Sequence, residues 1–162
     1  MGKLTLTGQA TGDILVFIHG YNNDQQVVLE RHRQLKKDLK ASGYKGAVIS
    51  FDWPSASSTL NYLEDRSDAK KTALKLVDDC IKLFTITQQK GCELNVHLLA
   101  HSTGAYVIRE AFDDADDRKS IASTNWSVSQ IAFIGADVSS KSMAERDSKS
   151  VSYTHLTLPT KA

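Results

Sequence analysis

The chain has 162 residues, a length that fits one domain with a core of ordinary size. Its 20 lysine and arginine residues nearly balance 19 aspartate and glutamate residues, so the formal net charge of +1 provides no overall field to attract nucleic acid or an anionic membrane. Hydrophobic residues make up 41% and charged residues 24%, which excludes a disordered, collagen-like or coiled-coil chain.

Strand and helix patterns alternate along the chain, which predicts an α/β fold with a mostly parallel sheet and helices on both faces. Lys3–Thr7 alternates like a half-buried edge strand. Asp13–Ile18 is a continuous apolar run, typical of a strand buried on both faces. Asp24 is a suitable N-cap for a helix that ends near Gly43.

The second half of the pattern continues in the same way. Three further buried strands are expected at Ala47–Phe51, Leu94–Leu99 and Gln130–Ile134, and two helices at about Ser67–Gln89 and Gly104–Phe112. The acidic stretch Asp113–Asp117 is expected to be a solvated helix end and loop. No repeat is evident along the chain.

Several protein classes are excluded by what the sequence lacks. Cys80 and Cys92 stand in no metal-ligand spacing and are too few for a disulfide framework. The longest apolar runs, Ile14–Ile18 and Val96–Ala100, are far shorter than the ~18 residues of a membrane span. The first residues lack the features of a secretory signal, so a cytoplasmic location is expected.

Ala100-His101-Ser102-Thr103-Gly104 joins the third buried strand directly to a helix. This is the context of the G-x-S-x-G nucleophile elbow, where small residues allow a sharp turn that exposes the serine hydroxyl above the sheet. The first position is Ala100, where the motif has glycine. Ser102 is therefore the candidate nucleophile, with His101 and Gly104 supporting the turn. The alternative is that Ser102 only caps the helix.

A second turn follows the strand that ends at Ile18, in His19-Gly20-Tyr21-Asn22-Asn23. In a serine enzyme with a nucleophile elbow, one oxyanion donor is the backbone N–H of the residue after the nucleophile, here Thr103. The other donor comes from an earlier strand-to-helix loop. Tyr21 is the first choice for this donor, followed by Asn22. The alternative is a turn with no catalytic part, built from residues that favour turns.

Asp137 stands just beyond the last predicted strand, in Gly135-Ala136-Asp137-Val138. In the chain order serine, acid, histidine, an acid at this place could orient the imidazole that takes the proton from Ser102. Because Ser139 and Ser140 follow, Asp137 could equally form an Asx turn or cap a helix.

A serine nucleophile needs a general base, and the chain has five histidines. His19 and His101 flank the two turns and, with Gly20, are expected to shape the site by packing and hydrogen bonding. Two others fall in a core strand and on a charged helix face. Only His155 follows Asp137, as the chain order requires.

The sequence at the end of the chain argues against His155 as the general base. Val151–Thr160 resembles the translation of a transposon-based sequencing-library adapter over ten consecutive residues. We therefore expect residues 151–162 to be a non-native tail and residues 1–150 to be a partial domain without its catalytic histidine. The alternative is a native tail in which His155 completes the triad.

Three blocks of the sequence, Val16–Asn23, Ile49–Ser55 with Tyr62–Arg66, and Val96–Gly104, carry a family resemblance. Together they resemble the α/β-hydrolase superfamily, and within it a group of bacterial esterase- or lipase-like proteins of poorly defined function. The resemblance implies a truncated α/β-hydrolase fold without metal or cofactor.

The same resemblance implies roles for individual residues. Ser102 would be the nucleophile, Tyr21 and Thr103 the oxyanion donors, and Asp137 the acid. Trp53 and Tyr62, with Asn22, either line the substrate pocket or, for the two aromatic residues, pack beneath a loop.

The predicted activity is hydrolysis of a carboxylic ester or thioester, from a small molecule or a lipid, through an acyl-enzyme on Ser102. A non-catalytic binding module of the same fold and an acyltransferase with the same nucleophile are the alternatives. The oligomeric state is not indicated.

Overall fold

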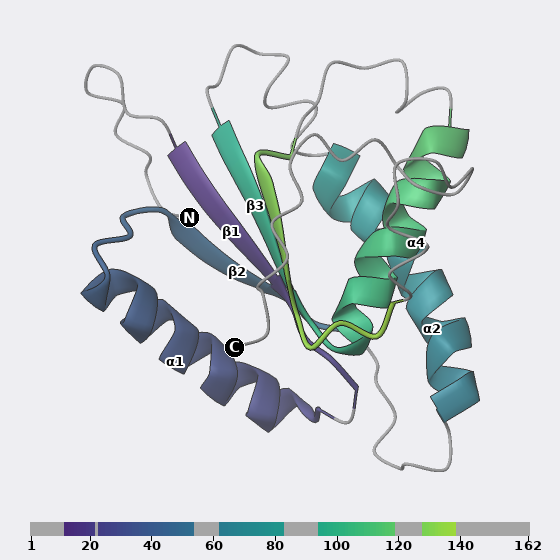
Figure 1. Cartoon of the computed structure of the whole chain (residues 1–162), viewed down its shortest axis with the longest axis horizontal. Helices are drawn as coiled ribbons and strands as arrows, with labels where there is room; N and C mark the ends of the chain where they lie inside the picture. The colour runs from purple at the N-terminus through teal and green to yellow at the C-terminus, as the bar shows by residue number, and fades with distance from the viewer. Residues whose placement is uncertain (1–11, 22, 54–61, 83–93, 119–127, 139–162) are drawn as a thin grey trace.

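A computed structural model describes residues 12–21, 23–53, 62–82, 94–118 and 128–138. Within these ranges four strands form a parallel sheet in the order β2-β1-β3-β4, and their bounds are β1 (Gly12–Ile18), β2 (Ala47–Phe51), β3 (Leu94–His101) and β4 (Gln130–Ile134). One face carries helix α1 (Gln25–Ala41), and the other carries α2 (Tyr62–Lys75), the π-helix η2 (Leu76–Ile81) and α4 (Thr103–Asp117), as Figure 1 shows. The predicted α/β fold is confirmed.

Helix α1 begins and ends at the residues that the sequence predicts. The carboxylate of Asp24 accepts a hydrogen bond from the backbone N–H of Val27 (2.8 Å), which satisfies a donor in the first turn. At the other end, the Ser42 N–H donates to the Asp38 carbonyl, and Gly43 has φ +87°, a conformation that glycine adopts without steric cost.

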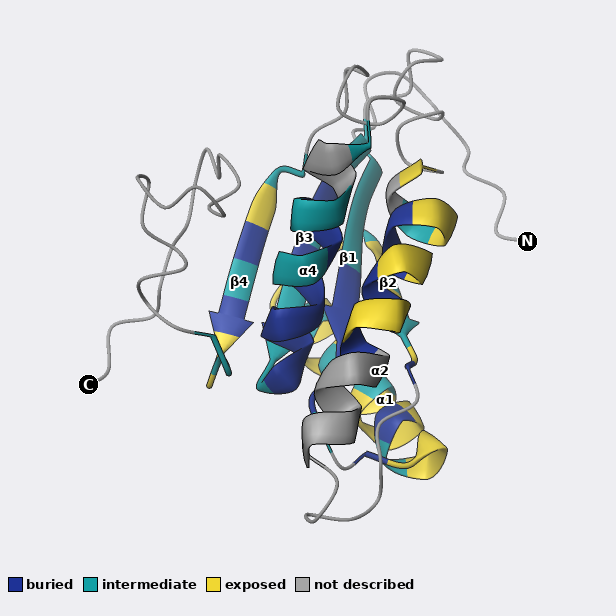
Figure 2. Ribbon diagram, turned by 90° about the vertical axis from the view of Figure 1, so that its right-hand side faces the viewer, coloured by how far each residue is buried: buried dark blue, intermediate teal, exposed yellow. Residues whose placement is uncertain are grey.

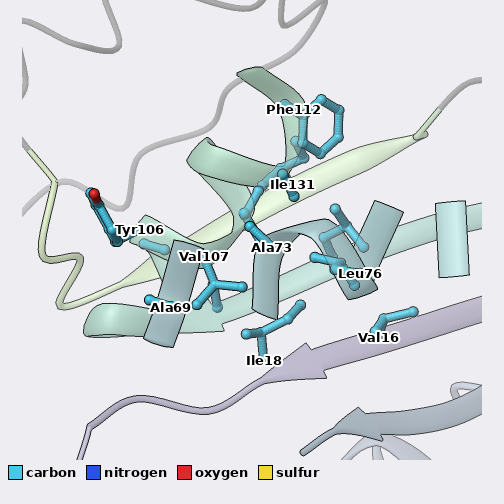
Figure 3. Packing of buried hydrophobic residues seen from close by; sticks show 14 of the residues in the cluster. Val16, Ile18, Ala69, Ala73, Leu76, Tyr106, Val107, Phe112 and Ile131 are labelled. Carbon is cyan, nitrogen blue, oxygen red and sulfur yellow. The ribbon is translucent and has the colours of Figure 1, made fainter. Parts of the chain in front are cut away.

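The main core lies between the sheet and the pair formed by α2 and α4 (Figure 3). Alternate residues of the central strands, Val16 and Ile18 on β1 and Val96 and Leu98 on β3, point to this side because successive side chains of a strand face opposite ways. Ala69, Ala73 and Leu76 from the α2–η2 segment and Val107, Ile108 and Phe112 from α4 complete it. The core therefore fixes the carboxyl ends of β1 and β3 beside each other. Figure 2 shows the buried residues of the strands and of α4 in dark blue.

The strands expected to be buried at Ala47–Phe51 and Gln130–Ile134, β2 and β4, are buried only in part. Ile49 on β2 is 42% exposed and Ile134 on β4 is 50% exposed. The reason is the strand order, which places β2 and β4 at the two edges of the described sheet. An apolar run predicts a strand, but its place in the sheet depends on contacts far away in the sequence.

Several predicted boundaries also need correction. Helix α2 begins at Tyr62, five residues before the predicted Ser67, and becomes the π-helix η2 at Leu76. Strand β3 runs to His101, past the predicted end at Leu99, and α4 continues through the acidic stretch to Asp117. The predicted Lys3–Thr7 strand and the end of the second helix lie outside the described residues.

Candidate active site

Ser102 is the single residue between the end of β3 at His101 and the start of α4 at Thr103. Its φ angle is +54°, and it has the only positive φ among the described residues other than glycine. This left-handed conformation costs an L-residue roughly 1–2 kcal/mol. The predicted tight strand-to-helix turn is thus present, and its strain is concentrated on the serine.

The backbone of Ser102 is held by the end of β4 and by the first turn of α4. Its N–H donates to the carbonyl of Ile134 (3.0 Å), and its carbonyl accepts from the N–H groups of Ala105 (3.0 Å) and Asp137 (3.2 Å). Asp137, which is half-buried, therefore lies at the same sheet edge as Ser102, as its position after the strand predicts.

The loop after β1 lies directly against this turn, and two glycines make the approach possible. A Cβ atom at Gly20 would lie 2.8 Å from Ser102 Cβ, and one at Gly104 would overlap the Ile18 carbonyl oxygen. Contacts this short do not occur in proteins, so both positions require glycine. The loop predicted to supply an oxyanion donor and the elbow are thus brought together.

His19 fixes that loop from beneath. Its side chain is fully buried, and the backbone N–H of Trp53 donates to Nε2 (3.2 Å). Nδ1 lies 2.9 Å from the Gly20 carbonyl oxygen, which can only accept, so Nδ1 donates to it. The amide of Asn23 donates to the same oxygen (2.7 Å). The supporting role predicted for His19 is consistent with these contacts.

Trp53 takes the packing alternative rather than lining an open pocket. It is 2% exposed, its ring stacks on the imidazole of His19 (centroids 5.4 Å apart, 15° between the planes), and its Nε1–H donates to the His19 carbonyl (2.8 Å). Asp52 Oδ1 also lies 3.1 Å from His19 Nε2. This cluster was not predicted from the sequence, although the register that pairs Ile18 with Phe51 places the residues that follow them side by side.

None of the described histidines is hydrogen-bonded to Ser102 Oγ. His32 is bonded to Ser50 Oγ (2.8 Å), and His97 Nε2 lies 3.8 Å from Asp13 Oδ1. His101 adjoins the elbow, where burial and, second, the Arg31 charge lower its pKa below the ordinary value of 6.5. His155 lies outside the described residues.

The structure describes the other predicted site residues to different extents. Thr103 is 1% exposed and opens α4, so its N–H belongs to the first turn, where backbone donors have no partner within the helix. Tyr21 is half-buried in the loop after β1. Tyr62 is the first residue of α2, its side chain is not described, and Asn22 lies outside the described residues.

The chemistry that this edge favours is the stabilisation of negative charge. Helix α4 begins directly after Ser102, and the positive end of its dipole favours negative charge there. Among the described residues no group of three or more histidine, cysteine or acidic side chains could hold a metal ion. In the same part of the chain, no helix is long and apolar enough to cross a bilayer.

Comparison with known proteins gives a family match over nearly the whole chain. The family model described as "Alpha/beta hydrolase of unknown function (DUF900)" matches residues 3–159. No curated protein matches. Two solved structures of the phospholipase PlaB from Legionella pneumophila, one of them in complex with thio-NAD, are similar at 17% and 16% identity with TM-scores of 0.48 and 0.49. Each alignment covers 76% of this chain and 25% of the PlaB chain.

Proposed function

Because the chain belongs to this family of α/β hydrolases of unknown function, we propose that it is built as a serine hydrolase for carboxylic esters or thioesters, with Ser102 as the nucleophile. The observation that carries the proposal is the single-residue turn at Ser102, with its positive φ, at the N-terminus of α4. A serine that only capped α4 would not need this conformation, because N-cap residues normally adopt extended backbone angles.

In the proposed reaction, Ser102 Oγ attacks the carbonyl carbon of a small-molecule or lipid ester and loses its proton to an imidazole. The carbonyl oxygen becomes an oxyanion, which the N–H groups of Thr103 and Tyr21 stabilise. Removing one such donor typically costs ~3–4 kcal/mol of transition-state stabilisation. The tetrahedral intermediate collapses with release of the alcohol or thiol, which takes the proton from the imidazolium. Water then hydrolyses the acyl-enzyme, with the imidazole taking a proton from the water and returning it to Ser102 Oγ.

We propose that Asp137 is the acid of the triad and that the catalytic histidine is not among residues 1–150. Asp137 is joined to Ser102 through its backbone N–H, which keeps its carboxylate at the same sheet edge. The proposal that residues 151–162 are not native removes His155. A serine enzyme without its histidine keeps only the contribution of the oxyanion hole and binding, still about 10³-fold above water. Turnover by this chain is therefore expected to be slow.

A fluorophosphonate probe tests the nucleophile directly, since it forms a stable covalent adduct with an activated serine hydroxyl. Mass spectrometry should locate the adduct on the peptide that contains Ser102, and free imidazole should speed its formation by supplying the missing base. Ser102→Ala should abolish the adduct. The matched control is Ser129→Ala. Ser129 directly precedes the amino end of β4, whereas Ser102 follows the carboxyl end of the neighbouring parallel strand β3.

The same assay tests the tail. His155→Ala should leave the rate of labelling unchanged if residues 151–162 are not native. A large drop in that variant would instead identify His155 as the base. Absence of any adduct at Ser102, with or without imidazole, would favour the non-catalytic binding module. An adduct that persists in Ser102→Ala would refute the assignment of the nucleophile.

A further inference from the structure

A cavity of about 450 Å³ lies between the end of α1 and the start of β2. Its lining includes Lys36 and Lys40 from α1 and Tyr44, Lys45 and Val48 from the segment that leads into the sheet. Because β2 and β3 run parallel, this cavity is at the amino edge of the sheet, whereas Ser102 is at the carboxyl edge. The two places are thus separate, at least a strand length of ~15 Å apart.

The ionised side chains that line this cavity are all basic. Three lysines line it and none of the lining residues is acidic. Lys36 and Lys40 are four residues apart on α1, so they project from the same side of the helix. The net charge of the whole chain is only +1, and this local concentration of positive charge therefore stands out against a nearly neutral protein.

The cationic surface continues from the cavity along α1. At about 100° per residue, the exposed side chains of Arg33, Lys36, Lys37 and Lys40 fall within one sector of roughly 100° on the helix circumference. That sector contains no acidic residue, because the two acids of α1, Glu30 and Asp38, project outside it. A negatively charged group would therefore approach the cavity across a surface of uniformly positive charge.

We propose that this cavity binds a phosphate monoester through Lys36, Lys40 and Lys45. Lysine binds phosphate as a point charge, and three ammonium groups can offset the two negative charges of a monoester. The alkyl stems of the lysines, with Val48, provide apolar walls for the organic part of the ligand. The cavity volume lies within the range of small-molecule sites, ~300–1,000 Å³.

Tyr44 adds a neutral donor to this set. Burial and, second, the carboxylate of Asp13 raise the pKa of its phenol, so the hydroxyl keeps its proton. Its present acceptor, the carbonyl of Ala47, is 3.5 Å away, a long contact that a phosphate oxygen can replace. The Asp13 side chain itself accepts from the amide of Asn95 (2.9 Å).

The competing explanation is that these lysines only complement the negative end of the α1 dipole, which basic residues near a helix C-terminus commonly do. Lys37 separates the two explanations. It is on the same helix, carries the same charge and is exposed, but it does not line the cavity. The dipole acts within the last turn of α1, where Lys40 is the only basic residue, and it predicts no binding of an anion, whereas a ligand site predicts binding that depends on Lys40 and not on Lys37.

Isothermal titration calorimetry of the whole chain with phenyl phosphate, and separately with inorganic phosphate, tests the proposal. We expect the wild type to bind phenyl phosphate with a Kd below about 1 mM. Lys40→Gln and Lys45→Gln should each weaken binding by about tenfold or more, and Lys37→Gln by less than about twofold. Unfolding midpoints of the variants check that each is folded.

Sedimentation with phosphatidylcholine vesicles, with and without phosphatidic acid, identifies the source of the phosphate. Binding only to vesicles that contain phosphatidic acid, lost in Lys40→Gln, would assign the site to a lipid headgroup. Binding of phenyl phosphate without vesicle binding would assign it to a free phosphate ester. The proposal is overturned if neither probe binds, or if Lys37→Gln loses as much affinity as Lys40→Gln. These readouts do not involve Ser102, so they are independent of the proposed hydrolase activity.

Discussion

Replacing Gly104 by alanine is the sharpest test of how closely the elbow is packed. Gly104 is the second residue of α4, directly after Thr103, and its Cα faces the backbone at the end of β1. At an open helical position, alanine would stabilise the fold by roughly 0.5–1 kcal/mol, because glycine loses more backbone freedom on folding. The sign of the effect therefore shows whether helix propensity or packing dominates here.

The geometry indicates that packing dominates. The new Cβ would overlap the carbonyl oxygen of Ile18 and lie 2.7 Å from that of His19. Both are backbone atoms, which cannot rotate away as a flexible side chain could. Opening both contacts to the 3.0 Å that real Cβ atoms respect requires the backbone to shift, and a catalytic group tolerates a displacement of only ~0.5 Å. Overpacking costs ~1–3 kcal/mol, and the gain in helix propensity offsets part of that cost, so we expect a net loss of about 1 kcal/mol.

Urea denaturation measures the loss of stability, and fluorophosphonate labelling measures the displacement of Ser102. The matched control is Gly43→Ala, since a Cβ at Gly43 meets nothing within 4 Å and only the positive φ opposes it. That control should lose ~1–2 kcal/mol and keep its labelling rate. If Gly104→Ala is as stable as the wild type or more stable, β1 and α4 do not approach each other this closely.

Three further changes test the supporting structure. Trp53→Phe removes the donor to the His19 carbonyl and should lower the free energy of unfolding by ~2 kcal/mol in urea, because a buried acceptor is left unsatisfied. Asp24→Ala removes the N-cap of α1 and should cost ~1 kcal/mol, most of which Asp24→Asn should retain. His101 has a lowered pKa through burial and the Arg31 charge, so below about pH 6.5 the unfolded chain takes up a proton that the folded chain does not. The urea midpoint of the wild type should consequently fall more steeply from about pH 7.5 to pH 5 than that of His101→Gln.

The elbow and the order of elements could be predicted from the sequence because their signals are local. The apolar run ends at Ala100 and the helical pattern begins at Gly104, so the sequence around Ser102 is too short to form a loop. Asp24 and Gly43 mark the ends of α1 by their own backbone chemistry. The place of Asp137 followed from the rule that parallel strands end at one edge of a sheet.

What could not be predicted depends on contacts between distant segments. Strand order decides that Ile49 and Ile134 are exposed, and no local pattern contains it. The contacts of His19 with Asp52 and Trp53 join residues 33 and 34 positions apart. The start of α2 at Tyr62 was missed although Asn61, which precedes it in the sequence, is a residue type common at helix N-termini.

The strain at Ser102 links these local and distant effects. A positive φ that costs ~1–2 kcal/mol persists only where surrounding contacts fix it more strongly. Here the contacts come from the end of β4 through Ile134 and Asp137, and from the loop after β1 through Gly20. Neither segment is near Ser102 in the sequence. The motif alone therefore specifies a turn, whereas the assembled sheet is what holds the serine in its left-handed conformation.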